Sequence, residues 1–222
     1  IAQLLWAVDD VVEKEKRIEQ EFAILYLSSL KEMFHANSKK MPLIDVCTGA
    51  PKYGANSPAI DYDGSVRYIR ITDIGQLGEL NADRVSARDH DDKYLLNYGD
   101  FLIARSADPG RSYYFKPEDG PCIHAGYLIK FPLDVDIILP EYLYFFTESA
   151  EYKLWIQQTT RTGTLSNINS KEFSALQVPV LSITKQKEVV EKMKSLQALL
   201  KQIKQKIEHS KALEKSLINQ VF

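Results

Sequence analysis

Three polar stretches of the sequence carry side chains able to hydrogen-bond the base edges and phosphates of DNA. Arginine presents paired N–H groups that match guanine or phosphate, and amide and hydroxyl side chains also reach base edges. Taken singly, each stretch is better explained as an ordinary solvated loop. The candidate DNA-contacting residues are Lys52, Tyr53, Arg67, Arg70, Arg105, Ser106, Arg111, Arg161, Thr164, Ser166 and Asn167. Arg67 and Arg70 lie three apart in an expected strand, so at least one can face the core or a structural acid instead.

Motifs for catalysis are missing from the sequence. It contains no GxGxxG, GxxxxGK[ST], HExxH or GxSxG pattern, and no Asn/Asp-Pro-Pro-Tyr/Phe motif of amino-methyltransferases. The four histidines are scattered, and we assign them no chemistry. These absences favour a binding protein, with no catalytic residue and no cofactor.

One nuclease-like pattern is an alternative. Asp134 or Asp136, followed by Glu151 and Lys153, resembles the Asp…Glu-x-Lys sets that hold magnesium beside a lysine. Residues i and i+2 share a face on a strand but not on a helix, and residues 140–158 are predicted to be helical. We therefore expect a solvated helix face here and no metal site.

Composition and charge narrow the class of protein further. The chain has 222 residues, 45% hydrophobic and 26% charged, which is enough for a folded core. Cys47 and Cys122 lack zinc-ligand spacing and fit a reducing, cytoplasmic compartment, and no apolar run is long enough for a membrane span. The first residue is Ile rather than Met, which suggests a processed chain or a fragment.

Both ends of the chain show the heptad spacing of paired helices. Steps of four and three from Val189 meet apolar residues at eight of ten positions, and the same steps from Ile1 do so at seven of ten. Each helix would be roughly 45 Å long, too long to bury its apolar edge in a small domain alone. Residues 1–35 carry 4 basic and 7 acidic side chains, whereas residues 185–222 carry 9 and 4, so their charges favour pairing. The residues expected to pack the helix pair are Leu5, Val8, Val12, Phe22, Leu196, Leu200, Ile203 and Ile207.

The middle of the chain has the composition of a mixed α+β domain. All nine prolines lie between the two helices, where turns and strands are expected. β-branched and aromatic residues predict strands at 66–74, 101–104, 123–131 and 177–180, and Pro140 opens a predicted helix that extends to about residue 158. The predicted organisation is a helix at 1–36, one globular domain at 37–184 and a helix at 185–222, with the helices paired as an antiparallel coiled coil within the chain or between protomers.

Several segments in order resemble a known family. They are LIDV to Gly49 (43–49), VRYIR with Asp73-Ile74 (66–74), YGDFLI into Arg105-Ser106 (98–106), Gly163-Thr164 to Asn167-Ile168-Asn169 (163–169), and Val178-Pro179-Val180 to Gln186-Lys187 (178–187). With a long helix on each side, they resemble a specificity subunit of a type I restriction-modification system. Thr184-Lys185 departs from the pattern, because family members often carry Pro-Pro and an acidic residue before this glutamine.

This resemblance implies a non-enzymatic protein whose residues 37–184 form a target recognition domain. Such a domain reads one half of a split site in double-stranded DNA, and the helices act as spacer and as docking surface for methyltransferase subunits, through which the restriction subunit joins. A homodimer or a second recognition domain would supply the other half-site. The middle segment, at 15 basic and 19 acidic residues, predicts weak and salt-sensitive DNA binding by the chain alone. The alternative is a coiled-coil adaptor protein that does not read DNA.

Overall fold

The computed structural model describes residues 2–34, 39–75, 77–89, 91–160 and 167–219. The chain forms two compact units, and each is described by itself. The helical unit joins Ile1–Met33 with Glu191–Phe222, and the α+β unit is Phe34–Val190. The mixed α+β fold with long terminal helices is as predicted from the sequence. No helix in the described part of the chain is both long enough and apolar enough to cross a membrane.

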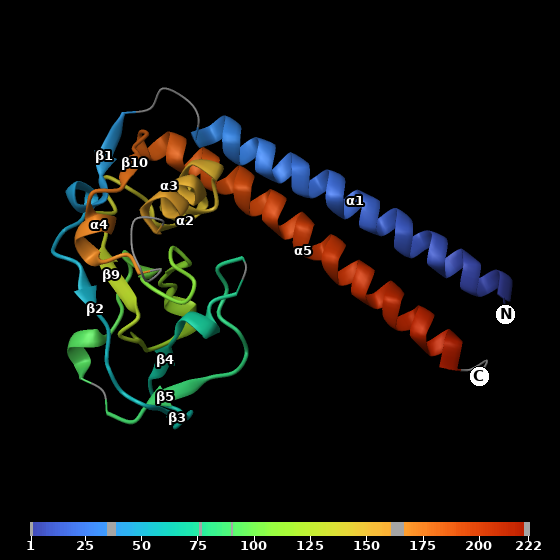
Figure 1. Cartoon of the computed structure of the whole chain (residues 1–222), viewed down its shortest axis with the longest axis horizontal. Helices are drawn as coiled ribbons and strands as arrows, with labels where there is room; N and C mark the ends of the chain where they lie inside the picture. Colours follow the sequence, from blue (N-terminus) through green and yellow to red (C-terminus); the bar gives the residue numbers. More distant parts are fainter. Residues whose placement is uncertain (1, 35–38, 76, 90, 161–166, 220–222) are drawn as a thin grey trace. The chain divides into compact units, whose positions relative to one another are not determined.

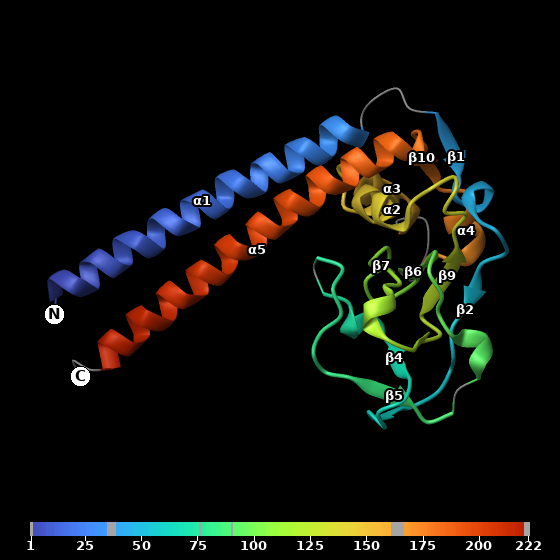
Figure 2. The ribbon, with the colours of Figure 1, turned by 180° about the vertical axis from the view of Figure 1, so that it is seen from behind.

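Two long helices make up the helical unit. Within it α1 (Ala2–Phe34) and α5 (Ile183–Asn219) lie side by side and run antiparallel (Figures 1 and 2). The residues expected to pack the pair are all withdrawn from solvent: Val8, Val12, Leu200 and Ile207 are buried, and Leu5, Phe22, Leu196 and Ile203 are partly buried. The heptad pattern therefore marks the inward side of both helices.

One charged pair lies among the apolar residues between these helices. Glu15 occupies a heptad position, is only 5% exposed, and has Lys206 Nζ 3.4 Å from its Oε1. A buried carboxylate is costly unless a cation meets it, so this pair favours one alignment of α1 against α5.

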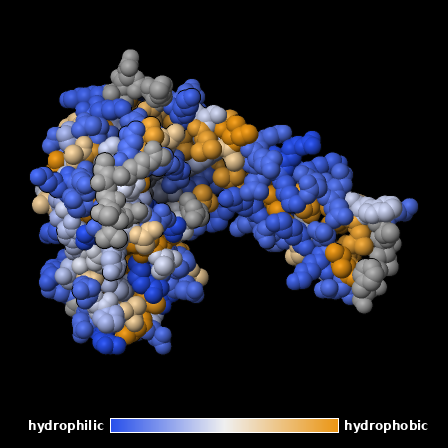
Figure 3. All heavy atoms as spheres, in the orientation of Figure 1, coloured by the Kyte–Doolittle hydropathy of each residue, from blue (hydrophilic) through white to orange (hydrophobic). Residues whose placement is uncertain are grey.

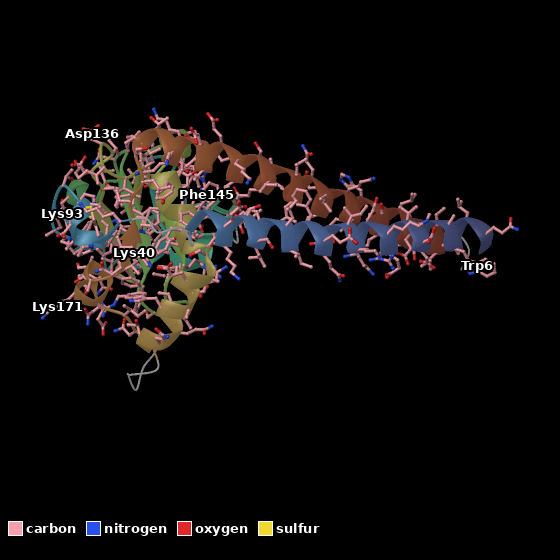
Figure 4. All side chains as sticks on the ribbon, turned by 90° about the horizontal axis from the view of Figure 1, so that it is seen from above. Trp6, Lys40, Lys93, Asp136, Phe145 and Lys171 are labelled. Atoms are coloured by element: carbon pink, nitrogen blue, oxygen red, sulfur yellow. The ribbon has the colours of Figure 1, made fainter. Side chains whose placement is uncertain are left out.

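A second apolar stripe on α1 faces solvent. Leu4, Val11, Ile18 and Leu25 recur every seven residues and are 44–51% exposed. In Figure 3, hydrophobic residues appear at several places on the otherwise hydrophilic surface of the helices, and Trp6, 71% exposed, lies near the N-terminal end of α1 (Figure 4). Apolar residues scattered singly are ordinary on a surface, but a heptad-spaced row resembles a coiled-coil contact.

The α+β unit is built around a four-stranded antiparallel sheet in the order β2-β9-β6-β7. Three two-stranded sheets surround it: β1-β10 and β3-β5 are antiparallel, and β4-β8 is parallel. The strands are β1 (Lys40–Pro42), β2 (Lys52–Tyr53), β3 (Ala59–Asp61), β4 (Arg67–Ile69), β5 (Val85–Ala87), β6 (Asp100–Ala104), β7 (Ser112–Tyr114), β8 (Cys122–His124), β9 (Leu128–Pro132) and β10 (Gln177–Pro179). The helices are α2 (Pro140–Thr147), α3 (Ala150–Thr160) and α4 (Ser170–Ser174).

Aromatic and aliphatic side chains fill the core between this sheet and α2. Every residue of β6 is buried, as is most of α2. Phe34 closes one side of the core, with its ring centroid 5.3 Å from that of Tyr142 and 5.6 Å from that of Phe146. This packing makes β6 a rigid support for the loop that follows it.

Three elements differ from their predicted bounds. The single helix expected over 140–158 is two helices, because Ser149 Oγ accepts a hydrogen bond from Tyr152 N at 3.3 Å and caps a new helix there. The strand expected at 66–74 ends at Ile69, where Arg70 and Asp73 close a helical turn through mutual hydrogen bonds. The strand expected at 123–131 divides into β8 and β9 around Gly126.

Gln186 joins the start of α5 to the segment that precedes α2. Its Nε2 donates to the carbonyl oxygens of Ile137 and Leu181, both at 2.8 Å, and its Oε1 accepts from Leu139 N at 2.8 Å. The side chain is fully buried, so no water competes for these bonds. One amide thereby satisfies three backbone groups.

Candidate nucleic-acid interface

Four side chains from three segments meet at one place on the surface of the α+β unit. The guanidinium carbon of Arg105 lies 4.9 Å from the ring centroid of Tyr53, and Arg105 Nε donates to Asn167 Oδ1 at 3.0 Å. Tyr53 donates its hydroxyl proton to Ser170 Oγ at 3.2 Å and accepts from Ser170 N at the same distance. We call Tyr53, Arg105, Asn167 and Ser170 the Arg105 cluster.

The central sheet positions the first two members of this cluster. Strand β9 lies between β2 and β6, and its Ile129 is paired with Tyr53 on one side and with Ile103 on the other. Arg105 follows β6 directly, and its backbone N–H donates to Tyr127 O at 3.0 Å. Neighbouring strands of a sheet lie roughly 5 Å apart, so this register sets Tyr53 and Arg105 within reach of each other.

The start of α4 positions the other two. Ile168 N donates to Arg105 O at 2.8 Å, which ties the segment before α4 to the end of β6. Asn169 caps α4, accepting from the backbone N–H groups of Lys171 and Glu172 while Glu172 Oε2 accepts from Asn169 N. This reciprocal cap fixes the backbone on which Asn167 and Ser170 lie.

The loop after Arg105 contains a strained turn. Asp108 N donates to Ser106 O at 2.8 Å, which closes a three-residue turn around Ala107, whose φ is 62°. Positive φ is unfavourable for a residue with a Cβ, and such strain is concentrated at functional sites. Ser106 thus occupies a tightly defined position beside the Arg105 cluster.

Positive charge predominates at the Arg105 cluster. Burial raises the pKa of Tyr53, but the hydrogen bonds from Ser170 and the positive charge of Arg105 outweigh it, so the net pKa is lowered. Lys52, next to Tyr53 in β2, and Lys171, next to Ser170 in α4, are both exposed, and Lys171 extends outward from α4 (Figure 4). The surface therefore offers cations beside an aromatic ring, the combination that binds nucleic acid.

The remaining predicted contact residues are not in this cluster. Arg67 is buried, and its Nη2 donates to the backbone and side-chain oxygens of Asn81. Arg70 is held by Asp73 through two side-chain hydrogen bonds. Arg111 donates to Asp108 Oδ2 at 2.6 Å and to Ile74 O at 2.9 Å. These contacts account for all three arginines within the fold. Arg161, Thr164 and Ser166 lie outside the described residues.

The acidic residues of the nuclease alternative do not form a metal site. Glu151 lies on α3 and pairs with Lys40 at 2.6 Å, while Lys153 lies 3.5 Å from Glu148. Asp134 Oδ1 accepts from Asp136 N within their own turn. Over the described ranges no three His, Cys, Asp or Glu side chains are grouped to hold a metal ion.

Several polar side chains are buried at the central sheet and the neighbouring strand β8. Lys130, opposite Lys52 in the sheet, is 7% exposed and lies 3.1 Å from Asp100 Oδ2. His124 is fully buried with Nδ1 3.4 Å from Tyr94 O. Burial, with a smaller contribution from the charge of Lys130, lowers the pKa of His124 to about 4.

Two residues of this surface were missed from the sequence. Ser170 holds the Tyr53 hydroxyl, and Tyr127, whose side chain is 65% exposed, accepts from Arg105 N through its carbonyl. Ser170 could have been found from the sequence because it follows Asn169 in a helix-capping pattern. Tyr127 could have been found because it is an aromatic residue that follows Gly126 in a turn.

The α+β unit thus presents Arg105 beside the Tyr53 ring on its surface, and the two long helices pair with each other in the helical unit. The family model described as "Type I restriction modification DNA specificity domain" matches residues 27–209. The chain belongs to this family.

Known proteins resemble the chain over most of its length. The type I restriction enzyme EcoBI specificity subunit of Escherichia coli is 25% identical over 175 residues, which is 77% of this chain and 36% of that protein. The HsdS subunit of Thermoanaerobacter tengcongensis has the same fold, with a TM-score of 0.69 and 16% identity over 100% of this chain and 56% of its own. A chain from a study of type I R-M complex assembly and conformational transition gives a TM-score of 0.73 and 17% identity over 99% of this chain and 56% of its own. The chain thus spans about a third of the curated relative and just over half of each of these solved structures.

Proposed function

We propose that this chain is a non-enzymatic DNA-recognition part of a type I restriction-modification complex. Residues 37–184 act as the target recognition domain and read one half of a split site in double-stranded DNA. The observation that carries this proposal is the Arg105 cluster, in which Tyr53, Arg105 and Asn167 converge from three of the polar stretches predicted to contact DNA. The family to which the chain belongs supports the same function.

The proposed contact surface consists of the residues that remain available to a ligand. Lys52, Tyr53, Arg105, Ser106 and Asn167 are exposed or partly exposed around the cluster. Arg161, Thr164 and Ser166 stay predictions from the sequence. Arg67, Arg70 and Arg111 bind groups of the protein itself, and we assign them structural roles.

We further propose that the helices dock the methyltransferase subunits. The inward sides of α1 and α5 are used by their own pairing, whereas Leu4, Val11, Ile18 and Leu25 form an exposed heptad row suited to an amphipathic helix. Helix α1 has 33 residues and is about 50 Å long, more than the roughly 35 Å of one DNA turn. That length suits a spacer between two reading domains, the second supplied by another copy or another domain. The restriction subunit would join through the methyltransferase.

DNA selection from a random duplex pool tests the function directly. The chain alone, and then the chain with the methyltransferase subunits of a type I system, is incubated with the pool at low and at physiological salt. We expect one short motif, single or split by an unread spacer, with weak enrichment by the acidic chain alone and strong enrichment in the complex. Equal affinity with and without the methyltransferase would contradict the proposed sharing of phosphate contacts.

The adaptor alternative is favoured by one observation, the exposed heptad row of α1. Val11→Asp should abolish methyltransferase binding on both readings, because it places a charge in that row. Arg105→Ala should weaken sequence-specific DNA binding only if the α+β unit reads DNA. A chain that binds the methyltransferase but enriches no motif, alone or in the complex, would establish the adaptor.

A further inference from the structure

The guanidinium of Arg105 is held along one edge by Asn167 and against one face by Tyr53. Its Nε donates to Asn167 Oδ1 at 3.0 Å, and its carbon lies 4.9 Å from the Tyr53 ring centroid. Among the described residues, the only hydrogen-bond partner of the Arg105 guanidinium is Asn167 at Nε, so Nη1 and Nη2 have none there. The protein thus uses one edge of the guanidinium and leaves the two terminal nitrogens side by side.

From this arrangement we infer that Arg105 recognises a guanine, donating from Nη1 and Nη2 to the O6 and N7 atoms on its major-groove edge. Tyr53 and Asn167 are then positioning residues, which set the plane and the direction of the guanidinium. The inference rests on the proposed function and adds to it the identity of one base in the half-site. Paired donors at this spacing match guanine, whereas adenine presents one donor and one acceptor at the same edge.

A phosphate group could also accept from two terminal nitrogens, but the surroundings favour the base. Arginine can also bind phosphate through paired N–H groups, but phosphate binding needs only a positive charge, which exposed lysines such as Lys52 and Lys171 supply as well. Tyr53 restrains the plane of the Arg105 guanidinium and Asn167 restrains its direction. Such restraint favours a contact that must discriminate between bases.

The restraint extends beyond the two positioning side chains. The Tyr53 hydroxyl is fixed by both Oγ and N of Ser170, and Ser170 begins the capped helix α4. The backbone of Arg105 is bound on both sides, by Tyr127 O at its N–H and by Ile168 N at its carbonyl. A contact built this way costs little ordering when DNA binds.

The first experiment compares motifs selected from a random duplex pool by the complex carrying wild-type chain, Arg105→Ala, or the control Arg88→Ala. Arg88 is an exposed arginine of the same unit with no part in the cluster. We expect Arg105→Ala to lose the preference for guanine at one position while the rest of the motif is kept. The preference at that position should fall by roughly 5- to 150-fold, the range for one bidentate contact. Arg88→Ala should select the wild-type motif.

The second experiment changes the DNA and takes its main readout from the wild-type complex. A duplex of the selected motif is made with 7-deazaguanine, which lacks the N7 acceptor, at the guanine assigned to Arg105. Affinity of the wild-type complex should fall at least fivefold, and Arg105→Ala should bind both duplexes equally. Because this result depends on the wild-type chain, it holds whether or not the variant folds well.

Substitutions of Asn167 test its positioning role, with discrimination at the assigned base pair as the measured quantity. Asn167→Ala should reduce discrimination at the same base pair while changing affinity for non-specific DNA less than twofold, and Asn167→Asp, which keeps an acceptor for Nε, should restore it. A merely structural effect would lower binding to all sequences alike.

Two outcomes would overturn the inference while the proposed function stands. One is a motif without guanine at any position sensitive to Arg105→Ala. The other is a uniform loss of affinity with a shallower salt dependence, which would make Arg105 a phosphate contact. Failure of the wild-type complex to enrich any motif would instead remove the proposed function itself.

Discussion

Replacing Gln186 should cost more stability than any other single polar substitution near the start of α5. Its fully buried side-chain amide makes three hydrogen bonds of 2.8 Å, to the backbone groups of Ile137, Leu139 and Leu181. Gln186→Ala leaves these three groups without partners in a site closed to water. A buried unsatisfied group costs about 1–3 kcal/mol, so the loss should reach about 3–6 kcal/mol after partial relaxation. That is a large part of the roughly 5–15 kcal/mol by which a domain is stable.

Urea unfolding followed by tryptophan fluorescence measures this loss. Trp155, whose ring centroid lies 5.6 Å from that of Phe173, reports on the α+β unit. Gln186→Met keeps most of the volume but none of the hydrogen bonds, so it should cost nearly as much as Gln186→Ala. Gln202→Ala, at an exposed position of the same helix, is the matched control and should change stability by less than about 0.5 kcal/mol. A Gln186→Met chain as stable as wild type would refute the hydrogen-bond argument and leave only packing.

Three further predictions concern other parts of the fold. The pKa of His124 is lowered from 6.5 to about 4 in the folded chain. Between these pH values the unfolded chain therefore binds more protons at this residue than the folded chain does. The free energy of unfolding should fall by roughly 3 kcal/mol as the pH is lowered from 6.5 to 4. Urea unfolding across that range checks it, and His124→Gln should flatten the slope; an unchanged slope would exclude His124 as the cause. Ala107→Gly should raise stability by about 0.5 kcal/mol, because glycine tolerates the φ of 62°, and a lower melting temperature would show that the turn is not strained. Val12→Asp should destabilise the α1–α5 pair by about 2 kcal/mol or more, as measured by thermal unfolding followed by circular dichroism. Val11→Asp, at a 44% exposed site, should change the melting temperature little in the same assay. Equal effects of the two substitutions would contradict the assignment of the inward side of α1.

The long helices were predictable because one physical period repeats across each of them. Every heptad position from Leu5 to Met33 and from Val189 to Leu217 is buried or partly buried in the structure. The burial of Glu15 did not follow from the period alone, because its partner Lys206 lies 191 positions away in sequence on the other helix. Which polar residue is buried among the apolar residues depends on how the two helices are aligned. The sequence of one helix alone does not determine that alignment.

Shorter elements were harder to predict because single side chains decide where they end. Ser149 divides one expected helix into two by capping the second, and its type is a known start signal, but the apolar spacing continues across it and hides the break. Arg70 and Asp73 likewise end a strand through a local ion pair at 2.8 Å that competes with the sheet. In both places a local hydrogen bond overrides a longer pattern.

The candidate site was predictable in its residue types and not in its assembly. Tyr53, Arg105 and Asn167 were chosen for their hydrogen-bonding chemistry. Tyr53 and Arg105 meet because Ile129 pairs with strands on both of its sides, and Asn167 joins them because Ile168 N donates to Arg105 O. Arg111 has the same chemistry, yet Asp108, three residues earlier in the same loop, takes its guanidinium. Strand register and loop geometry thus separate a ligand-binding arginine from a structural one.

The pairing of β1 with β10 has a consequence for how this protein can change. The register sets Lys40 opposite Pro179, and Val180 N donates to Lys39 O at 2.9 Å, so the chain enters and leaves the α+β unit at adjacent points. A segment whose two ends are neighbours can be lengthened, shortened or exchanged without altering the spacing of the residues that flank it. The 140 residues from Lys40 to Pro179 could therefore diverge, or be replaced as a block, while the heptad spacing of the helices stays intact.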